Sequence, residues 1–334
     1  MRIAVDAMGS DNYPVPDVAG AVMAARQSDD TIILVGNETT IKTELAKHDT
    51  SGAALEVVHA GQVIAMEDKP SQVVREKRDS SMHVGLNLVK SGDANAFVTA
   101  GNTGGALGVA MLRGVGLGRI PGIKRPALGA IFPTPDRPLL VDYGANADCR
   151  PEHLLQFAIM GSLYVQRVLG INEPRIALMS NGEEEGKGNI LVHETAPLLK
   201  ASSLNYVGKI EPKELLRGAV EVVVTDGFTG NILMKTAEAV GKYMSEMIRE
   251  YIKANPFTAV GGLLARPAFD RVKKHLDPDE VGGVPLLGIN GVVIVAHGSS
   301  GTIAIKRAIE QARIVVEKEV VEAIATGIKR EGKN

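Results

Sequence analysis

The chain has 334 residues, of which 45% are hydrophobic and 23% are charged, so it can bury a sizeable core and is not expected to be disordered. Its formal net charge is −2 and only 4% of its residues are aromatic, which argues against a basic footprint or a stacking platform for nucleic acid. Cys149 is the one cysteine, so no disulfide forms within the chain, and no apolar run suits a signal peptide or a membrane-spanning helix. We therefore expect a cytoplasmic protein.

Units of strand, glycine-rich turn and helix recur along the chain and predict its elements in order. Strands with the turns and helices that follow them are expected at 2–26, 93–114, 137–170, 174–200, 219–244 and 291–325. Single strands are expected at 31–36, 55–60 and 204–210, and a helix at 83–92 that Gly92 closes. The pattern predicts an α/β fold, with a mostly parallel sheet flanked by helices, as one unit over 1–334 of two interwoven subdomains.

The segment 243–276 breaks this alternation and predicts a helical hairpin insertion, with two helices joined by "NPFTAVGG". Apolar and basic side chains gather around and after that turn: Phe257, Leu263, Leu264, Arg266, Arg271, Lys273 and Lys274. Such a hairpin packs on itself or on a second subunit, or it presents an apolar, basic tip to a membrane surface or an acidic partner. The residues alone leave both interpretations open.

Five polar, glycine-rich loops follow predicted strands: "TAGNTGG", "DYGANAD", "SNGEEEGKGN", "TDGFTGN" and "AHGSSGT". We expect them at one edge of the sheet, where the carboxyl ends of parallel strands form the ligand site of open α/β folds. Helix N-termini there point free N–H groups outward, which suits an anion, and phosphate is the first candidate. One such loop alone is typical of a plain helix start, whereas five together favour a site.

Several familiar chemistries lack their motifs. The sequence contains no dinucleotide fingerprint, no GxxxxGK[ST] loop, no GxSxG elbow and no Cys or His pair at zinc-ligand spacing. Arg150 stands next to Cys149 and would lower the pKa of its thiol, but a small buried side chain is the favoured role for that cysteine.

The charged residues of the loops remain as candidates for a site. Lys187, Asp226 and His297 lie in three of them, and Lys235 follows in the next helix. Each also has a plainer role: Asp226 as a helix cap, His297 as a structural histidine and Lys235 as a solvated helix residue.

Six segments together resemble the bacterial family of acyl-acyl carrier protein:phosphate acyltransferases, called PlsX. They are "MRIAVDAMGSDNYP", "TAGNTGGA", "VDYGANADCRPEHLLQFAIMGSLY", "NGEEEGKGN", "VVVTDGFTGNILMK" and "HGSSGTIAIKRAI", in family order, and the resemblance runs from Met1 to about Glu317. The chain departs from the family at Ser10, where glycine is common, and at Cys149.

The resemblance implies an enzyme that makes acyl phosphate from inorganic phosphate and a fatty acyl-acyl carrier protein, for phosphatidic acid synthesis. It implies a fold similar to phosphotransacetylases and to isocitrate/isopropylmalate dehydrogenases. It also implies a homodimer loosely associated with the inner face of the membrane, and a membrane glycerol-3-phosphate acyltransferase that takes the product. The alternative is a phosphotransacetylase acting on short acyl-coenzyme A.

Under this hypothesis phosphate is itself the nucleophile, so the protein must orient it and stabilise an oxyanion, without a cofactor or metal. The phosphate-binding candidates are Asn102, Thr103, Gly104, Ser299 and Ser300. The catalytic candidates are Lys187 for charge, Asn189 and Asn231 for the thioester carbonyl, His297 or Lys187 for departure of the thiolate, and Asp226 for orientation. The basic residues of the hairpin would dock the acidic carrier protein.

Overall fold

The computed structural model describes residues 1–334 except 113, 115, 133, 135, 277–281 and 332–334, and the side chains of 273–276 also lie outside the described part. Its strands are β1 (Arg2–Asp6), β2 (Thr31–Gly36), β3 (Leu55–His59), β4 (Ala96–Thr99), β5 (Ala127–Ile131), β6 (Leu139–Val141), β7 (Ile176–Met179), β8 (Tyr206–Ile210), β9 (Val222–Val224), β10 (Gly283–Leu287) and β11 (Val292–Ala296). Within these residues they form one sheet of eleven strands, in the order β3-β2-β1-β4-β11-β10-β5-β6-β9-β7-β8.

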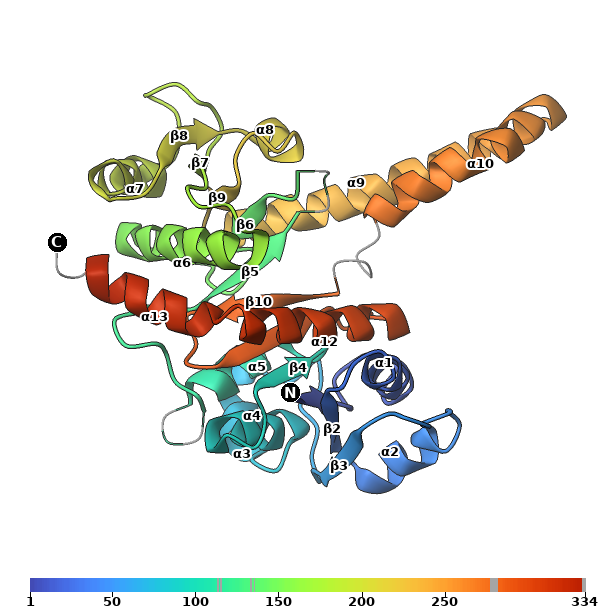
Figure 1. Cartoon of the computed structure of the whole chain (residues 1–334). Helices are drawn as coiled ribbons and strands as arrows, with labels where there is room; N and C mark the ends of the chain where they lie inside the picture. The colour runs from blue at the N-terminus through green and yellow to red at the C-terminus, as the bar shows by residue number, and fades with distance from the viewer. Residues whose placement is uncertain (113, 115, 133, 135, 277–281, 332–334) are drawn as a thin grey trace.

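Helices fill most of the connections between these strands, as the alternation predicted (Figure 1). They are α1 (Val15–Ala25), α2 (Glu38–Leu45), α3 (Pro70–Glu76), α4 (Ser81–Ser91), α5 (Thr103–Met111), α6 (Pro151–Leu169), α7 (Ile190–Ala201), α8 (Pro212–Leu216), α9 (Gly227–Lys253), α10 (Pro256–Leu276), α12 (Thr302–Glu317) and α13 (Val320–Glu331). Gly92 ends α4 with a left-handed φ of 85°, which confirms its predicted role as the helix end.

The sheet has two parallel halves that run in opposite directions. In one half β1, β2, β3, β4 and β11 are parallel, and in the other β6, β7, β8 and β9 are parallel. Between them the pairs β11–β10, β10–β5 and β5–β6 are all antiparallel. The sequence pattern missed β5 and β10, because "ALGAI" and "GVPLL" carry a glycine or a proline, which weaken a strand signal.

Helices cover both faces of the sheet and bury it in three apolar clusters. One cluster spans both halves under α1, α6, α7, α12 and α13. On the opposite face, a second cluster lies under α3, α4 and α5, and a third lies under α8 and α9. Alternate residues of β1 serve the two faces, since Ile3 lies in the first cluster and Ala4 in the second. A fully buried Ile or Leu contributes about 1.5–3 kcal/mol, so these clusters are the main source of stability.

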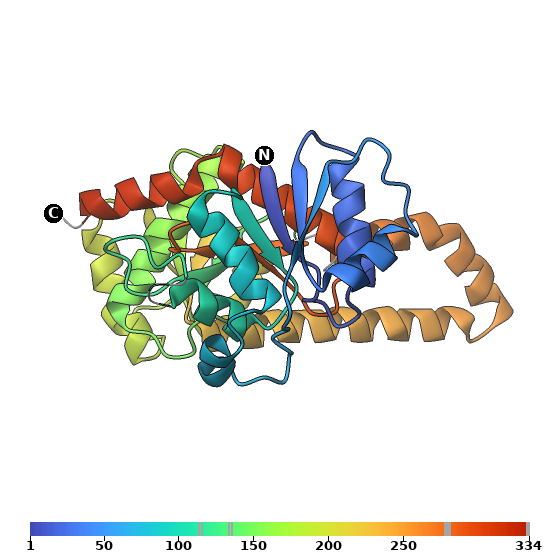
Figure 2. The same cartoon turned by 90° about the horizontal axis from the view of Figure 1, so that it is seen from below.

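The helical hairpin is longer than predicted and turns earlier. Helix α9 runs unbroken from Gly227, and α10 begins at Pro256, so the connection is 254–255 rather than the whole "NPFTAVGG" stretch. Asn255 caps α10 by accepting from the N–H of Thr258 at 2.9 Å. A Cβ at Gly262 would lie 2.3 Å from Ile252, so this glycine allows close packing of the two helices instead of forming a turn. Figure 2 shows the hairpin projecting well beyond the sheet.

Candidate functional site

The loop after β4, "TAGNTGG", begins α5, and Asn102 is its N-cap. The side-chain oxygen of Asn102 accepts from the N–H of Gly105 at 2.9 Å. Its amide nitrogen donates to the carbonyl oxygens of Ala65, Met66 and Asp68 at 3.0–3.2 Å. The amide is therefore fully used within the chain, and Asn102 holds the segment 65–68 over the start of α5.

Pro70, just beyond that covering segment, packs on Gly104, and the segment itself reaches the loop after β11. A Cβ at Gly104 would lie 2.7 Å from Pro70, and a Cβ at Gly298 would lie 2.5 Å from the methyl group of Met66. Thr103 is half-buried as the first residue of α5. Because β4 and β11 are adjacent and parallel, the two loops lie next to each other, as predicted.

In the loop after β11, "AHGSSGT", His297 and Ser299 are exposed and Ser300 is buried. The Nδ1 atom of His297 lies 2.7 Å from the hydroxyl of Ser299 and 3.3 Å from its N–H. Both contacts are made by Nδ1, and they fix the orientation of the imidazole ring. Helix α12 starts directly afterwards without a side-chain cap, so its first N–H groups lack an internal acceptor.

A buried acidic cluster lies beneath these two loops. Asp6, at the end of β1, accepts from the hydroxyl of Thr99 at 2.8 Å, and burial raises the pKa of its carboxyl. Asp17, on α1, accepts from the hydroxyl of Ser10 at 2.5 Å, and burial raises its pKa to about 7. The second carboxylate oxygen of Asp17 is buried without a partner. Ser10 is not among the residues with positive φ, so serine causes no backbone strain at this position.

The loop after β6 is organised by Asp142, whose carboxylate is buried and accepts five hydrogen bonds. The donors are the backbone N–H groups of Leu128, Gly144, Ala145 and Asn146 and the side-chain amide of Asn146, at 2.8–3.2 Å. Burial raises the pKa of Asp142, and these donors oppose the rise. These N–H donors stabilise the charged carboxylate of Asp142, and the same hydrogen bonds fix the backbone conformation of the loop.

Helix α9 starts directly against this loop because glycine faces it. A Cβ at Gly230 would lie 2.1 Å from the carbonyl oxygen of Asp142, which no side chain tolerates. Asp226 is the N-cap of α9 and accepts from the N–H of Thr229 at 2.7 Å, so the plainer interpretation of Asp226 holds. Asn231 is exposed, with Cβ and Cγ 3.9 Å from a Cβ built at Gly144.

Cys149 is half-buried near the same helix start, and its thiol donates to the carbonyl of Asn146 at 3.6 Å. Burial, with the charges of Asp142 and Asp226, raises the pKa of this thiol to about 12. The side chain is therefore a neutral thiol near pH 7 and has no character of a nucleophile, which agrees with its favoured role.

The loop after β7 carries Lys187 and Asn189. Asn189 caps α7 by accepting from the N–H of Val192 at 2.9 Å. Lys187 is exposed, and its stem lies across Gly182, where a Cβ would be 2.6 Å from its Cγ. Among the described residues, no ion pair or hydrogen bond occupies its ammonium group. Lys187 is thus a cation with its charge available to a ligand.

The strand directions correct one expectation, that all five loops share one edge of the sheet. The loops after β4 and β11 follow strands that run opposite to β6, β7 and β9. The candidate residues therefore fall into two groups. The loops after β4 and β11 carry Asn102, Thr103, Gly104, His297, Ser299 and Ser300. The loops and helix starts after β7 and β9 carry Lys187, Asn189, Asp226 and Asn231. Tyr143 links the two halves, because it packs against both the cluster under α5 and the cluster under α9.

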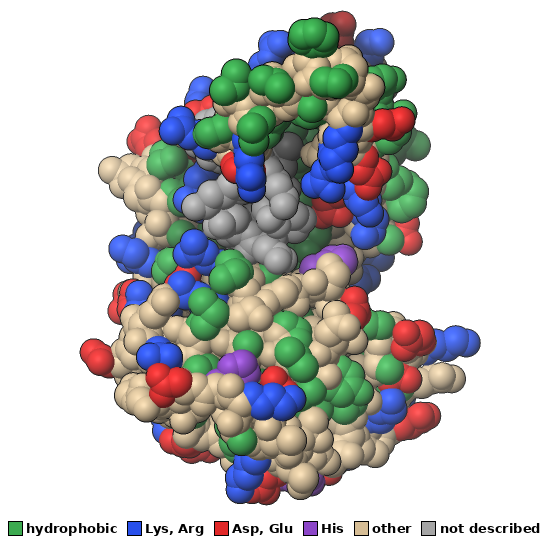
Figure 3. All heavy atoms as spheres, turned by 90° about the vertical axis from the view of Figure 1, so that its right-hand side faces the viewer, with side chains coloured by type: hydrophobic (Ala, Val, Ile, Leu, Met, Phe, Trp, Pro, Cys, Tyr) green, Lys and Arg blue, Asp and Glu red, His purple; other side chains and the backbone are tan. Residues whose placement is uncertain are grey.

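The far end of the hairpin presents apolar side chains to solvent (Figure 3). Phe257 is 90% exposed, Leu264 78% and Leu263 68%. Arg266 and Arg271 are exposed on the same helix, and Arg266 lies 3.7 Å from Asp270. The side chains of Lys273 and Lys274 lie outside the described residues.

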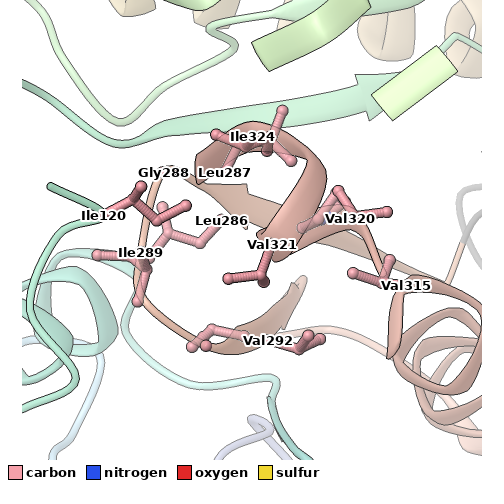
Figure 4. A pocket seen from close by; sticks show the side chains of 13 residues that line it. Ile120, Leu286, Leu287, Gly288, Ile289, Val292, Val315, Val320, Val321 and Ile324 are labelled. Atoms are coloured by element: carbon pink, nitrogen blue, oxygen red, sulfur yellow. The ribbon is translucent and has the colours of Figure 1, made fainter. Parts of the chain in front are cut away.

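A small pocket lies elsewhere, between the β10–β11 turn and α12–α13 (Figure 4). Its lining residues are apolar or glycine, including Ile120, Leu286, Val292 and Ile324, so it offers no polar side chain to orient a ligand. In the described part of the chain, no cluster of three or more His, Cys, Asp or Glu side chains is placed to hold a metal. No described helix is both long and apolar enough to cross a bilayer.

Sequence reasoning missed two residues that hold the second group of loops. They are Asp142 and Lys209, whose ammonium group donates to three carbonyl oxygens of the loop after β7. Asp142 follows a strand and precedes "YGAN", which resembles an ordinary turn. Four of its five donors come from that turn, and only the N–H of Leu128 comes from another part of the chain. Lys209 lies in an edge strand, where a lysine normally signals a solvated position. No pattern in the sequence distinguishes Lys209 from the exposed lysines of the chain.

The fold defines a structural class, the α/β proteins with the phosphotransacetylase fold. A phosphotransacetylase from Streptococcus pyogenes superposes with a TM-score of 0.59 at 17% identity, over 96% of this chain and 94% of the other. A branched-chain phosphotransacylase from Enterococcus faecalis V583 superposes with a TM-score of 0.56 at 16% identity, over 95% and 99%. At such identities the likeness concerns the fold, and it confirms the predicted fold class.

The sequence identifies the family within this class. Residues 1–323 match the model of a family described as "fatty acid synthesis protein". A relative from Geobacter sulfurreducens named "phosphate acyltransferase" is 46% identical over 332 residues, which cover 99% of this chain and 95% of that protein. The chain therefore belongs to this family, and the resemblance inferred from the six segments is confirmed.

Proposed function

We propose that this chain is a phosphate acyltransferase, an enzyme that forms acyl phosphate from inorganic phosphate and a fatty acyl-acyl carrier protein. The product would feed phosphatidic acid synthesis. The observation that carries the proposal is the match at 46% identity, over nearly the whole chain, to a relative with that name. The loops after the strands support it, because they combine neutral donors, one imidazole and one available ammonium group.

In the proposed reaction a phosphate oxygen attacks the thioester carbonyl carbon. A C–O bond forms, and the carbonyl oxygen becomes an oxyanion. The oxyanion then collapses, the C–S bond breaks, and the thiolate of the carrier leaves with the electron pair and accepts a proton. A thiolate is a good leaving group, so the main task is to desolvate phosphate and stabilise the oxyanion.

We assign roles from the contacts of each side chain. Lys187 offsets the charge of phosphate or oxyanion, since its ammonium group is available. His297, oriented through Nδ1 by Ser299, would protonate the departing thiolate with Nε2. The N–H groups of Thr103 and Gly104 and the hydroxyls of Thr103 and Ser300 would bind phosphate, while Ser299 is engaged with His297 and Asn102 holds the covering segment. Asn189 and Asn231 remain proposed partners of the carbonyl, and Asp226 shapes the start of α9.

The direct test is acyl phosphate formation from palmitoyl-acyl carrier protein and inorganic phosphate, with no cofactor added. We expect release of the carrier thiol to depend on phosphate, and one hydroxylamine-reactive acyl phosphate to appear per thiol released. Thiol release without phosphate dependence would indicate a thioesterase and contradict the proposal. The alternative, a phosphotransacetylase, is tested by offering acetyl-coenzyme A under the same conditions. Faster turnover of acetyl-coenzyme A than of palmitoyl-acyl carrier protein would favour that alternative.

We further propose that the hairpin tip contacts the membrane and the carrier protein. Phe257, Leu263 and Leu264 supply exposed apolar area, and Arg266 and Arg271 supply positive charge for anionic headgroups or an acidic carrier. Flotation with vesicles of anionic lipid tests this. Replacement of Leu263 and Leu264 by aspartate is expected to abolish flotation, and retained flotation would place membrane contact elsewhere.

The chain would act as a homodimer and pass its product to a membrane glycerol-3-phosphate acyltransferase. The exposed apolar residues Tyr243 and Tyr251 on α9 support a dimer, because an isolated chain rarely leaves so much of a helix uncovered. We also retain the division of the unit into two interwoven subdomains, which the two opposed parallel halves support. Molar mass by light scattering tests the dimer, and a monomer at micromolar concentration would contradict it.

A further inference from the structure

The loop 184–187, which carries Lys187, is held by another lysine. Lys209, on β8, donates from Nζ to the carbonyl oxygens of Glu184 at 2.5 Å, Glu185 at 3.0 Å and Lys187 at 2.7 Å. An ammonium group has three N–H donors, and all three are directed to one loop. The side chain is half-buried at the edge of the sheet.

The remaining contacts of the loop leave Lys209 as its main anchor. The N–H of Lys187 donates to Glu184 at 3.0 Å within the loop, and the N–H of Gly188 donates to the side chain of Asn181 at 2.9 Å. The side chains of Glu183, Glu184 and Glu185 are exposed and carry three like charges in sequence. Like charges side by side favour open conformations, so the loop needs an internal cation to stay closed.

We propose that Lys209 is a positioning residue for the phosphate acyltransferase reaction, and that it acts by fixing the backbone from which Lys187 presents its ammonium group. The proposal rests on the proposed role of Lys187. The two lysines have different roles. Lys209 donates its three N–H groups to backbone carbonyl oxygens, while the ammonium group of Lys187 is available to bind the ligand. A displacement of the catalytic group by about 1 Å can cost on the order of 100-fold in rate, so an anchor of this kind affects catalysis directly.

The test is a double-mutant cycle with Lys209→Met and Lys187→Ala. Lys209→Met keeps the length of the stem and removes the three donors. We expect it to lower kcat/KM for phosphate about tenfold and to leave KM for acyl carrier protein unchanged. In the Lys187→Ala background the same substitution is expected to change kcat/KM less than twofold, because the group it positions is gone. Lys209→Arg, which restores donors, is expected to recover part of the loss.

Two controls separate positioning from stability and from the proposed function. Lys200→Met removes an exposed lysine on the neighbouring helix α7 and is expected to leave kcat/KM unchanged. Hydrogen exchange at 184–188 reports on the loop whether or not the chain turns over, and it is expected to speed up in Lys209→Met but not in Lys200→Met. Unchanged exchange, wild-type kcat/KM in Lys209→Met, or a full further tenfold loss in the Lys187→Ala background would each overturn the inference. If the wild type shows no acyl phosphate formation, the proposed function is rejected. The hydrogen-exchange result then still tests whether Lys209 anchors the loop.

Discussion

Two loops that look alike in the sequence differ in what they offer a ligand. At 102–105 the polar side chain of Asn102 is used entirely inside the chain, on one N–H group and three carbonyl oxygens. At 184–189 the backbone is anchored by Lys209, and the ammonium group of Lys187 is left available. Glycine and asparagine after a strand therefore indicate a helix start, and only the neighbours decide whether the start is also a site.

The strongest test of this contrast is Lys187→Ala. If the loop 184–189 supplies the charge for catalysis, the substitution is expected to lower kcat about 100-fold, the usual cost of losing one stabilising group at a developing oxyanion. Initial rates of acyl phosphate formation measure the effect, with circular dichroism to verify the fold and Lys200→Ala as the matched surface control. A kcat within twofold of the wild type would remove Lys187 from the mechanism.

The loop at 102–105 is tested by Asn102→Ala, which is expected to lower the free energy of unfolding rather than to remove a catalytic charge. The substitution removes a helix cap, worth about 1 kcal/mol, and leaves three carbonyl oxygens of the covering segment without their donor, so the total loss is expected to be about 2–3 kcal/mol. Asn37→Ala is the matched control, because Asn37 caps α2 without such a segment and should lose only about 1 kcal/mol. Urea unfolding compares them, and equal losses would show that the contacts to 65–68 contribute nothing.

The buried acidic cluster under the same loop predicts a pH effect. The pKa of Asp17 is about 7 in the folded chain, above its ordinary value, so the folded state binds more protons between about pH 4 and pH 7. This carboxyl therefore makes stability fall as pH rises through that window, with no further change above it. Asp17→Asn resembles the protonated form and is expected to gain about 2–3 kcal/mol relative to the wild type between about pH 5 and pH 8.

Thermal or urea unfolding at several pH values measures that difference. Ser10→Gly is a useful companion, because the hydroxyl of Ser10 donates to Asp17 and lowers its pKa. Its removal is expected to raise the pKa further and extend the fall in stability to higher pH. Parallel stability curves for the wild type and Asp17→Asn would contradict the assignment.

The smallest effect is expected at the hairpin, whose charged side chains are largely exposed to solvent. Reversal of Arg266 and Arg271 to glutamate is expected to raise KM for acyl carrier protein about threefold to tenfold at low ionic strength, with kcat unchanged. Added salt of about 0.5 M is expected to remove the difference, because screening acts strongly on exposed charges. Unchanged KM at low salt would place the docking surface elsewhere, and a loss that persists in salt would indicate an effect other than charge.

Much of the fold followed from local pattern. Continuous apolar runs such as 292–296 are buried along their whole length, because strands covered by helices on both faces need apolar side chains in both directions. The hairpin was recognised but its connection was misplaced, because Gly261 and Gly262 resemble a turn. Gly262 instead fits against Ile252, which is information about packing that the local pattern does not contain.

Pattern singled out the candidate residues of the site, and it offered the helix-cap role only for Asp226. Asn189 and Asp226 proved to be helix caps, and Asn102 both a cap and an anchor for 65–68. Asp142 and Lys209, which shape the loops of the second half, carried no signal. Lys209 bonds to carbonyl groups far from it in the sequence, and Asp142 bonds mainly to N–H groups of the turn that follows it. Most of these partners are backbone groups, which have no identity in a sequence.

The sequence by itself determined the family, the alternation of strands and helices, and the absence of a reactive thiol pair or nucleotide motif, because these depend on residue type and spacing. Only the tertiary structure decided the direction of the two halves of the sheet. Three antiparallel steps through β10 and β5 reverse the second half, so the five polar loops do not share one edge. Tertiary contacts also decided which polar groups are consumed by the chain and which remain for a ligand, because hydrogen-bond partners far apart in sequence meet only after folding.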